Sequence, residues 1–322
     1  MENSIIDPAP PSMEGFVWRP ITRDDLAAVV ALAAKCHLAD GGLAAMNEPS
    51  SLMSRYFQDG LGTAIGVFAA NDLLIACTSV HLAREADTAR AIIVGQVQPE
   101  LRHRGIGTYL IRWSHVQAQA LLTTPTVDKR VLQIATESLT ESASHLYQAH
   151  GYESVFEELV MRRDLHLPLP DSPMPRDVII TSWHPTLANL FFRAYETSFR
   201  ERPGFPSWSG DEWISWTADD DNFKPEWSLL AQASGGEPLG FLTADSEHLS
   251  GFVAQIGVVP GQRRRGLGSA LMVETMRRMQ TAGAGSTQLT VNVNNPGAIQ
   301  AYAKLGFATI GRRARYERIA ER

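Results

Sequence analysis

Two segments of the chain, about 160 residues apart, carry nearly the same pattern. One runs from Val97 to Gly107 and the other from Val258 to Gly268, and each joins apolar residues, a proline and an arginine-containing turn with two glycines. This order predicts a strand, a glycine turn and a helix start, where free backbone N–H groups and the helix dipole attract phosphate. Because the pattern occurs twice, the chain is predicted to contain two copies of one anion-binding domain.

Length and composition agree with two soluble domains. At 322 residues the chain is longer than one hydrophobic core usually serves. Its 44% hydrophobic and 20% charged residues are typical of a globular protein. Cys36 and Cys77 have no metal or redox spacing, so we expect them to be small core residues.

The net charge and the N-terminal sequence restrict the expected partners and location. A formal net charge of −6 argues against a general nucleic-acid-binding protein. The first residues lack the basic start and apolar core of a signal peptide, and no apolar run is long enough to cross a bilayer. We therefore expect a cytoplasmic protein with no membrane, nucleic-acid or metal partner.

The hydrophobic pattern divides the chain into four parts. We expect residues 1–15 to be a loose lead-in, 16–165 a first domain, 166–176 a proline-rich extended linker and 177–322 a second domain. Expected strands lie at 16–20, 66–70, 73–80, 91–97, 131–135 and 152–161, and again at 178–182, 228–233, 239–244, 252–259, 288–293 and from 307 onward. Each half therefore predicts an α/β fold with a mixed sheet and helices on both faces.

A second motif occupies residues 294–307. Asn295 is a good helix N-cap, and Gly306 can adopt the left-handed conformation that ends a helix. The spacing of Asn295, Ala298 and Tyr302 places them on one helix face. Taken alone, such a tyrosine is typical of a half-buried core aromatic, and the asparagine is explained by capping.

The two motifs together resemble those of the GCN5-related N-acetyltransferases, the GNAT superfamily. Its acyl-CoA motif, [Q/R]-x-x-G-x-[G/A] after a bulged strand, is matched by residues 102–107 and 263–268. Its later motif, N-x-x-A-x-x-x-Y followed by x-x-x-G-[F/Y], is matched by Asn295, Ala298, Tyr302, Gly306 and Phe307. The first half has at these places Thr140, Ala143, Tyr147, Gly151 and Tyr152. The chain is also similar to the tandem branch that includes mycothiol synthase, which implies two tandem GNAT acyl-CoA N-acyltransferase domains.

The resemblance implies an N-acetyltransferase that uses acetyl-CoA as co-substrate and acetylates a primary amine of a small molecule directly. Tyr302 would be the general acid, because a phenol with a pKa of about 10 is protonated at neutral pH and can donate to a departing thiol of pKa about 8.5. In the second half the implied CoA-binding residues are Val258, Val259, Arg263, Arg264, Arg265, Gly266, Leu267, Gly268, Ser269 and Asn295. In the first half they are Val97, Arg102, His103, Arg104, Gly105, Ile106, Gly107 and Thr108.

The chain departs from the mycothiol synthase branch at the general base. Those enzymes carry a glutamate on the strand before the glycine turn, whereas residues 249–259 contain no carboxylate. Asp245 and Glu247, in a predicted loop, or a water chain are the remaining candidates. Because the second half keeps Asn295 where the first has Thr140, we expect the second domain to be catalytic and the first to be degenerate or non-catalytic.

Other interpretations of these residues stay open. A non-catalytic acetyl-CoA sensor agrees with the missing strand carboxylate, while the acidic net charge disfavours nucleic-acid contact through the clustered arginines. Trp208, Trp213 and Trp216 form either an acceptor pocket or the core of a lid. The motifs do not identify the acceptor amine. Two domains in one chain favour a monomer or a weak homodimer.

Overall fold

The chain forms two units, each built of strands and helices. The computed structural model describes residues 14–58, 62–85, 87–123, 127, 129–202, 205, 208–247 and 249–320. The first unit comprises Met1–Leu159 and Ile310–Arg322, and the second comprises Val160–Thr309. The segment 203–208 adds to the resemblance to the mycothiol synthase branch, and its residues 203, 204, 206 and 207 lie outside the described residues.

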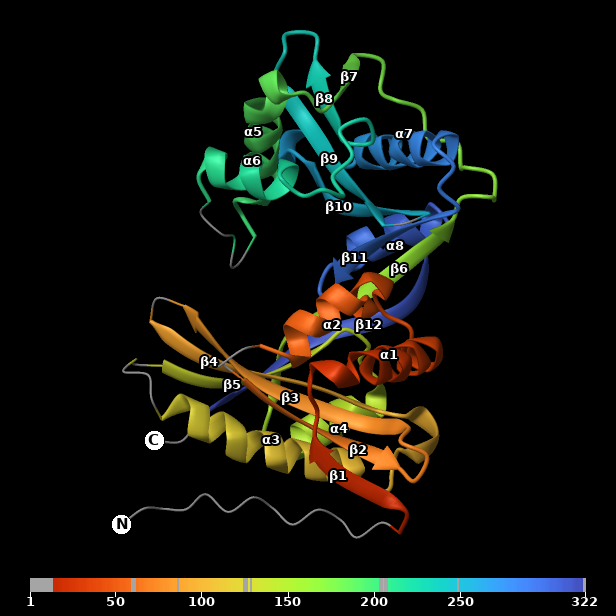
Figure 1. The fold of residues 1–322 in the computed structure, drawn as a ribbon. Coiled ribbons are helices and arrows are strands. Elements are labelled where there is room, and N and C mark those ends of the chain that lie inside the picture. The colour runs from red at the N-terminus through yellow and green to blue at the C-terminus, as the bar shows by residue number, and fades with distance from the viewer. Residues whose placement is uncertain are drawn as a thin grey trace. The chain divides into compact units, whose positions relative to one another are not determined.

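The first unit is a mixed sheet with helices on both faces (Figure 1). Its strands lie in the order β1 (Phe16–Pro20), β2 (Gly62–Ala69), β3 (Leu74–Glu85), β4 (Thr88–Val97), β5 (Lys129–Thr136) and β12 (Ala308–Ile319). Its longer helices are α1 (Leu26–Asp40), α2 (Pro49–Tyr56), α3 (Ile106–Leu122) and α4 (Glu141–Ala149). The apolar sides of α1 and α2 bury one face of the sheet, and α3 buries the other.

The second unit repeats this arrangement. Its strands lie in the order β6 (Glu153–Asp164), β11 (Ser286–Asn292), β10 (Ser250–Val258), β9 (Pro238–Glu247), β8 (Leu229–Ala233) and β7 (Val178–Ser182), and β6 belongs to this unit from Val160 onward. Its longer helices are α5 (Ala188–Phe199), α6 (Gly210–Ala218), α7 (Leu267–Thr281) and α8 (Pro296–Lys304). An aromatic core lies between α5, α6 and one face of the sheet, and α7 packs on the other face. The expected α/β class with mixed sheets in two tandem domains is confirmed.

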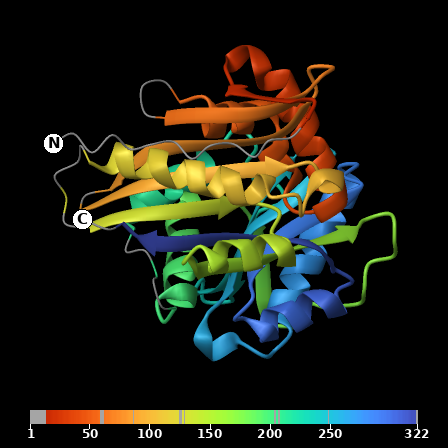
Figure 2. The ribbon, with the colours of Figure 1, turned by 90° about the horizontal axis from the view of Figure 1, so that it is seen from below.

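The last strand of the chain completes the sheet of the first unit. Strand β12 pairs antiparallel with β5, from Ala314 opposite Thr136 to Ile319 opposite Val131 (Figure 2). Tyr316 of this strand is 1% exposed, within the core under α3. The sequence predicts 177–322 as one continuous domain, whereas the structure places Ile310 onward in the first unit. The reason is that β5 supplies the backbone partner that β12 needs.

The N-cap of one helix and the presence of two short helices differ from the sequence prediction. The pattern predicts a capping box of Ser138 and Glu141, but the N-cap of α4 is Thr140, whose Oγ1 accepts the N–H of Ala143 at 3.1 Å. Helices α2 and α6 were not predicted, because eight and nine residues give too few turns for a clear periodicity. Both cysteines are free and buried, which confirms their expected core role.

Membrane-spanning helices and metal-binding clusters were sought among the described residues alone. None of their helices combines the length and apolar character that crossing a membrane requires. Within the same residues, no cluster of three or more His, Cys, Asp or Glu side chains is placed to hold a metal ion.

Candidate active site

The two glycine turns have the same backbone conformation. Gly105 and Gly266 both have φ of +83°, and His103 and Arg264 have φ of +61° and +64°. Helices α3 and α7 begin directly after these glycines. A Cβ at Gly266 would meet no atom within 4 Å, so glycine is required there by the left-handed backbone and the space in front of the turn is open. Open N–H groups at a helix start fit a pyrophosphate.

The first arginine of each turn braces the turn against a helix. Arg102 donates from Nε to the carbonyl of Val97 at 3.1 Å, and its guanidinium binds Asp40 of α1 at 2.7 and 2.6 Å. Arg263 donates from Nε to the carbonyl of Val258 at 3.1 Å and from its guanidinium to the carbonyl of Ser198 in α5 at 2.9 Å. These two side chains therefore position the turns, whereas the neighbouring His103, Arg104, Arg264 and Arg265 are exposed.

In each unit the two parallel strands separate before the glycine turn. Strand β4 pairs with β5 only over residues 88–93 and then continues to Val97. Strand β10 pairs with β11 only over residues 250–253 and then continues to Val258. A wedge therefore opens between the parallel strands, and an extended ligand with amide groups can add to its edge.

The backbone of Val258 faces this wedge, and that of Val259 does not. The N–H of Val259 donates to the carbonyl of Leu239 on β9 at 3.0 Å. Successive residues of a strand present their backbone groups to opposite edges, so those of Val258 point toward the wedge. Gln98 repeats this contact in the first unit, where its N–H donates to the carbonyl of Ile75 at 2.8 Å.

A β-bulge distinguishes the two wedges. The register between β10 and β9 shifts between Val253 and Gln255, so Ala254 is the extra residue. In contrast, β4 pairs with β3 without interruption from Val97 to Thr88. A bulge leaves backbone groups of the extra residue unpaired. Those groups lie where the wedge between β10 and β11 begins.

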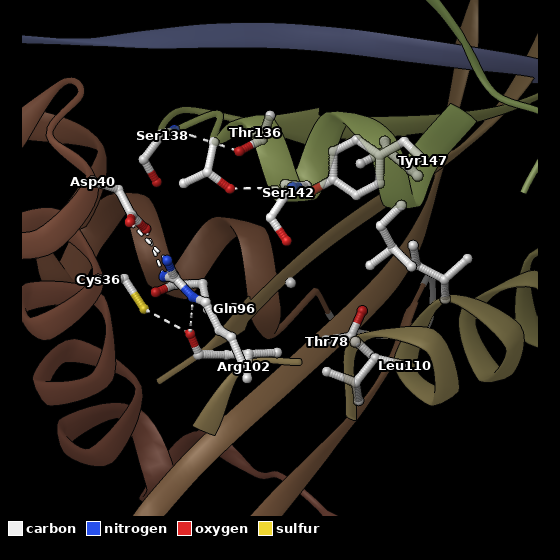
Figure 3. A pocket seen from close by; sticks show the side chains of 18 of the residues that line it. Cys36, Asp40, Thr78, Gln96, Arg102, Leu110, Thr136, Ser138, Ser142 and Tyr147 are labelled. Atoms are coloured by element: carbon white, nitrogen blue, oxygen red, sulfur yellow. Dashed lines mark hydrogen bonds and ion pairs between the residues drawn. The ribbon is translucent and has the colours of Figure 1, made fainter. Parts of the chain in front are cut away.

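The first unit contains a cavity of about 160 Å³ at its wedge (Figure 3). Four predicted CoA-binding residues line it, namely Val97, Arg102, His103 and Gly107. Its other lining groups include the hydroxyls of Thr136, Ser138, Thr140, Ser142 and Tyr147. The remaining predicted residues of this half, Arg104, Gly105, Ile106 and Thr108, do not line the cavity, and Ile106 is a core residue with 1% exposure.

Tyr147 and Tyr302 hold equivalent places on α4 and α8. Burial raises the pKa of each to about 12, so both phenols are protonated at neutral pH. The ring of Tyr147 contacts Tyr316 at 5.2 Å between ring centroids, and that of Tyr302 lies 6.0 Å from Phe307. The side-chain oxygen of Asn295 accepts the N–H of Ala298 at 3.2 Å, so this asparagine caps α8.

Asp245 is a half-buried carboxyl on β9 of the second unit. The sequence prediction of a loop here is wrong, because β9 extends through Glu247 and pairs Asp245 with Phe252 on β10. Desolvation, followed by the negative charges of Asp220 and Glu247, raises the pKa of Asp245 to about 6. The alternation of Phe241, Thr243 and Asp245 was the sequence signal that the strand continues past Ala244.

The tryptophans of the α6 region have different roles. Trp213 is fully buried, stacks on Tyr195 at 5.0 Å and donates from Nε1 to Oε1 of Gln255 at 3.2 Å. Trp216 is 56% exposed and contacts Trp208 at 5.1 Å between ring centroids. The sequence left open an acceptor pocket or the core of a lid, and the structure shows Trp213 as a packed core residue.

Comparison with known proteins supports the resemblance. Residues 186–307 match the sequence profile described as Acetyltransferase (GNAT) family. The mycothiol acetyltransferase of Acidothermus cellulolyticus is 26% identical over 297 residues, which cover 86% of each chain. That of a Parafrankia species is 26% identical and covers 92% of this chain and 95% of its own.

Solved structures show the same two-domain fold. A GCN5-related N-acetyltransferase from Sphaerobacter thermophilus superposes with a TM-score of 0.74 at 25% identity, covering 95% of this chain and 96% of that one. A tandem GNAT protein from the clavulanic acid biosynthesis pathway has a TM-score of 0.63 at 15% identity, covering 95% and 99%, and supports the fold alone. The expected GNAT resemblance is confirmed: residues 186–307 match the GNAT acetyltransferase family, and the whole chain shares the fold of solved tandem GNAT proteins.

Proposed function

We propose that the chain transfers the acetyl group of acetyl-CoA directly to a primary amine of a small molecule, and that the second unit carries out the reaction. The observation that carries this proposal is the bulge at Ala254, which β4 of the first unit lacks. Unpaired backbone N–H groups at the start of the wedge are suited to polarise a thioester carbonyl. GNAT acetyltransferases use acetyl-CoA, so the donor follows from the family.

The residues of the second unit fit CoA. The open space in front of Gly266 and the start of α7 would accept the pyrophosphate, with Arg264 and Arg265 adding positive charge. Pantetheine would add to the wedge edge of β10 at Val258. Leu267 is 3% exposed and positions the turn through the core, so its predicted contact with CoA would be through its backbone. Gly268 and Ser269 extend the same helix start.

Tyr302 would act as general acid. A phenol that stays protonated can donate to the sulfur as the C–S bond breaks and the C–N bond forms. Direct transfer is supported by the cysteines, because both lie in the first unit and burial raises the pKa of Cys36 to about 11 and that of Cys77 to about 12. Neither thiol provides a ready thiolate for an acyl-enzyme.

The acceptor would be a polar amine of the general kind that the relatives' names suggest. Several relatives are named mycothiol acetyltransferase, but the chain lacks a carboxylate on β10, where the resemblance to mycothiol synthase implies a glutamate. We therefore propose a polar primary amine without assigning mycothiol chemistry. The first unit, with an unbulged β4, would be structural or hold acetyl-CoA without turnover. We further propose a cytoplasmic monomer or weak homodimer.

The experiment that tests this function is acetyl-CoA binding by calorimetry for wild type, Gly266→Asp and Gly105→Asp. The two glycines have the same φ, so each variant is the structural control for the other. Loss of binding with Gly266→Asp, together with amine acetylation by wild type, is expected. Turnover that survives Gly266→Asp and is lost with Gly105→Asp would move the reaction to the first unit. Binding without turnover of any amine would favour the acetyl-CoA sensor.

A further inference from the structure

Three residues form a row across the sheet of the second unit. Asp245 on β9 lies opposite Phe252 on β10, and Phe252 lies beside Gln288 on β11. Paired residues of neighbouring strands point to the same face, with Cβ atoms about 5 Å apart. Asp245, Phe252 and Gln288 therefore share one face, and the row lies two residues before the bulge at Ala254.

This face of the sheet is the one that α6 covers. Thr243 lies two residues before Asp245 on β9 and is paired with Gln255. Gln255 in turn accepts a hydrogen bond from Trp213 of α6. Thr217 follows Trp213 by one helical turn on the buried side of α6. The polar side chains of the row and of α6 thus face each other across this side of the sheet.

Several of these polar groups have no partner. Oε1 of Gln288, Oγ1 of Thr243 and Oγ1 of Thr217 are buried and form no hydrogen bond within the described residues. Their side chains are only 7%, 1% and 6% exposed. Buried polar groups in folded proteins nearly always have partners. Two of these groups, on Thr243 and Gln288, share one face of the sheet and indicate a polar ligand that supplies the missing hydrogen bonds.

The charges that raise the pKa of Asp245 are negative, although Lys224 follows Phe223, which forms a β-bridge with Asp245. Asp220 follows α6, and Glu247 lies on β9 itself, while Phe252 and Gln288 on the neighbouring strands are uncharged. In the described part of the chain, no basic side chain forms an ion pair with Asp245. A cationic group brought by a ligand would relieve this repulsion.

We propose that this face is the acceptor site, with Asp245 as the general base for a polar ammonium acceptor whose other polar groups bind Gln288 and Thr243. The inference rests on the acetyl transfer proposed above. The base of this chain thus lies on the strand next to the one that carries it in the mycothiol synthase branch. Its carboxyl is opposite Phe252 and beside the bulge where the acetyl carbonyl would be held.

The proton balance of the step is complete with these groups. Asp245 takes one proton from R–NH3+ and later releases it to water. The neutral nitrogen attacks the thioester carbon, the C–N bond forms and the C–S bond breaks. Tyr302 donates a proton to the sulfur. The nitrogen then loses its second proton to the Tyr302 oxygen, which restores the phenol. A carboxyl with a pKa of about 6 is mostly ionised at neutral pH and is a better base than an ordinary aspartate.

The test is the pH profile of kcat/KM with acetyl-CoA and a panel of glucosamine, lysine and 1,4-diaminobutane. Wild type should lose activity below pH of about 6. Asp245→Asn should lower kcat/KM by about a hundredfold or more and remove this acid limb, and Asp245→Glu should restore part of the rate. Asp220→Asn should move the limb to lower pH, because a charge that raises the pKa of Asp245 is gone. Asp221 is an exposed neighbour, so Asp221→Asn is the matched control. It should change neither kcat/KM nor the pH of the acid limb.

Binding measurements separate this inference from the proposed function. Calorimetry of the CoA-loaded protein with the same amines should show at least tenfold weaker binding for Gln288→Leu, with acetyl-CoA affinity unchanged. An Asp245→Asn variant that keeps its rate or its acid limb overturns the assignment of the base. Wild type that binds acetyl-CoA but neither binds nor acetylates these amines overturns the acceptor class. A wild type that does not bind acetyl-CoA contradicts the proposed function itself.

Discussion

Asp245 and His81 occupy the same position in the two repeats. Val258 and Val97 end the strands before the glycine turns and pair with Gly240 and Ala76. Five residues further along the neighbouring strand lie Asp245 and His81, each with its side chain partly or fully buried. Desolvation shifts both toward the neutral form, since it raises the pKa of Asp245 and lowers that of His81. The equivalent position therefore holds an acidic side chain in the second unit and a basic side chain in the first.

His81 should make the first unit less stable in acid. Desolvation and then the charge of Arg55 lower the pKa of His81 below the ordinary histidine value of 6.5. The unfolded chain binds the proton more readily, so the stability contributed by neutral His81 is present above about pH 6.5 and is lost as pH falls below it. Thermal unfolding of wild type and His81→Asn at pH 7.5 and 5.5 should show a smaller loss of Tm in the variant. An equal loss in both would show that His81 does not titrate on unfolding.

Asp245→Asn should stabilise the second unit while it lowers activity. The folded pKa of about 6 lies above the ordinary aspartate value of 3.8, so the ionised carboxyl costs stability at neutral pH. This cost diminishes as pH falls through the folded pKa, which is the reverse of the His81 case. Because the carboxyl is partly solvated, we expect a gain of about 1–2 kcal/mol at pH 7.5 and little gain near pH 4.5. Urea unfolding at both pH values, with Asp221→Asn as control, measures the difference, and an unchanged midpoint would contradict the buried-charge argument.

Tyr302→Phe and Tyr147→Phe should separate the two units by activity. Both phenols are buried to a similar extent and have a pKa of about 12, so each change removes only a hydroxyl. If Tyr302 protonates the leaving sulfur, its variant should lose about a hundredfold in kcat with little change in acetyl-CoA affinity. The Tyr147 variant should keep its rate. A larger loss with Tyr147→Phe would place the reaction at the cavity of the first unit.

The strand–turn–helix repeat was predictable because its glycines and periodic apolar residues are local signals. The expected strands recur in the structure, with β1 and β7 at the predicted bounds. The extension of β9 to Glu247 was not predicted, since polar residues at a strand end resemble a loop. The GNAT resemblance implied a bulged strand before each glycine turn, but the sequence did not show that β10 is bulged and β4 is not, because a bulge depends on the register against the neighbouring strand. The pairing of Asp245 with Phe252, on which the proposal of Asp245 as base rests, was therefore not predictable from the sequence.

The sequence pattern also did not predict which strand the last strand, β12, pairs with. Residues from 307 onward read as a strand, but alternation does not identify the partner strand. The choice is set by side chains at a distance in sequence: Arg313 binds Glu158 at 2.9 Å, and Arg315 binds Glu137 at 2.5 Å. Glu137 is 7% exposed, and the guanidinium groups of Arg313 and Arg315 are its ion-pair partners.

Glu137→Gln should therefore destabilise the first unit through β12. Arg313 and Arg315 would keep only part of their pairing, and a nearly buried amide would replace a carboxylate that receives two guanidinium groups. Breaking a buried pair by changing one partner costs about 3–5 kcal/mol, and less here because both arginines are about a quarter exposed. Denaturant unfolding should show a loss of about 2 kcal/mol. Glu141→Gln, on the exposed side of α4, is the control and should stay within about 0.5 kcal/mol. Equal midpoints for wild type and Glu137→Gln would mean that backbone pairing with β5 alone holds the last strand in place.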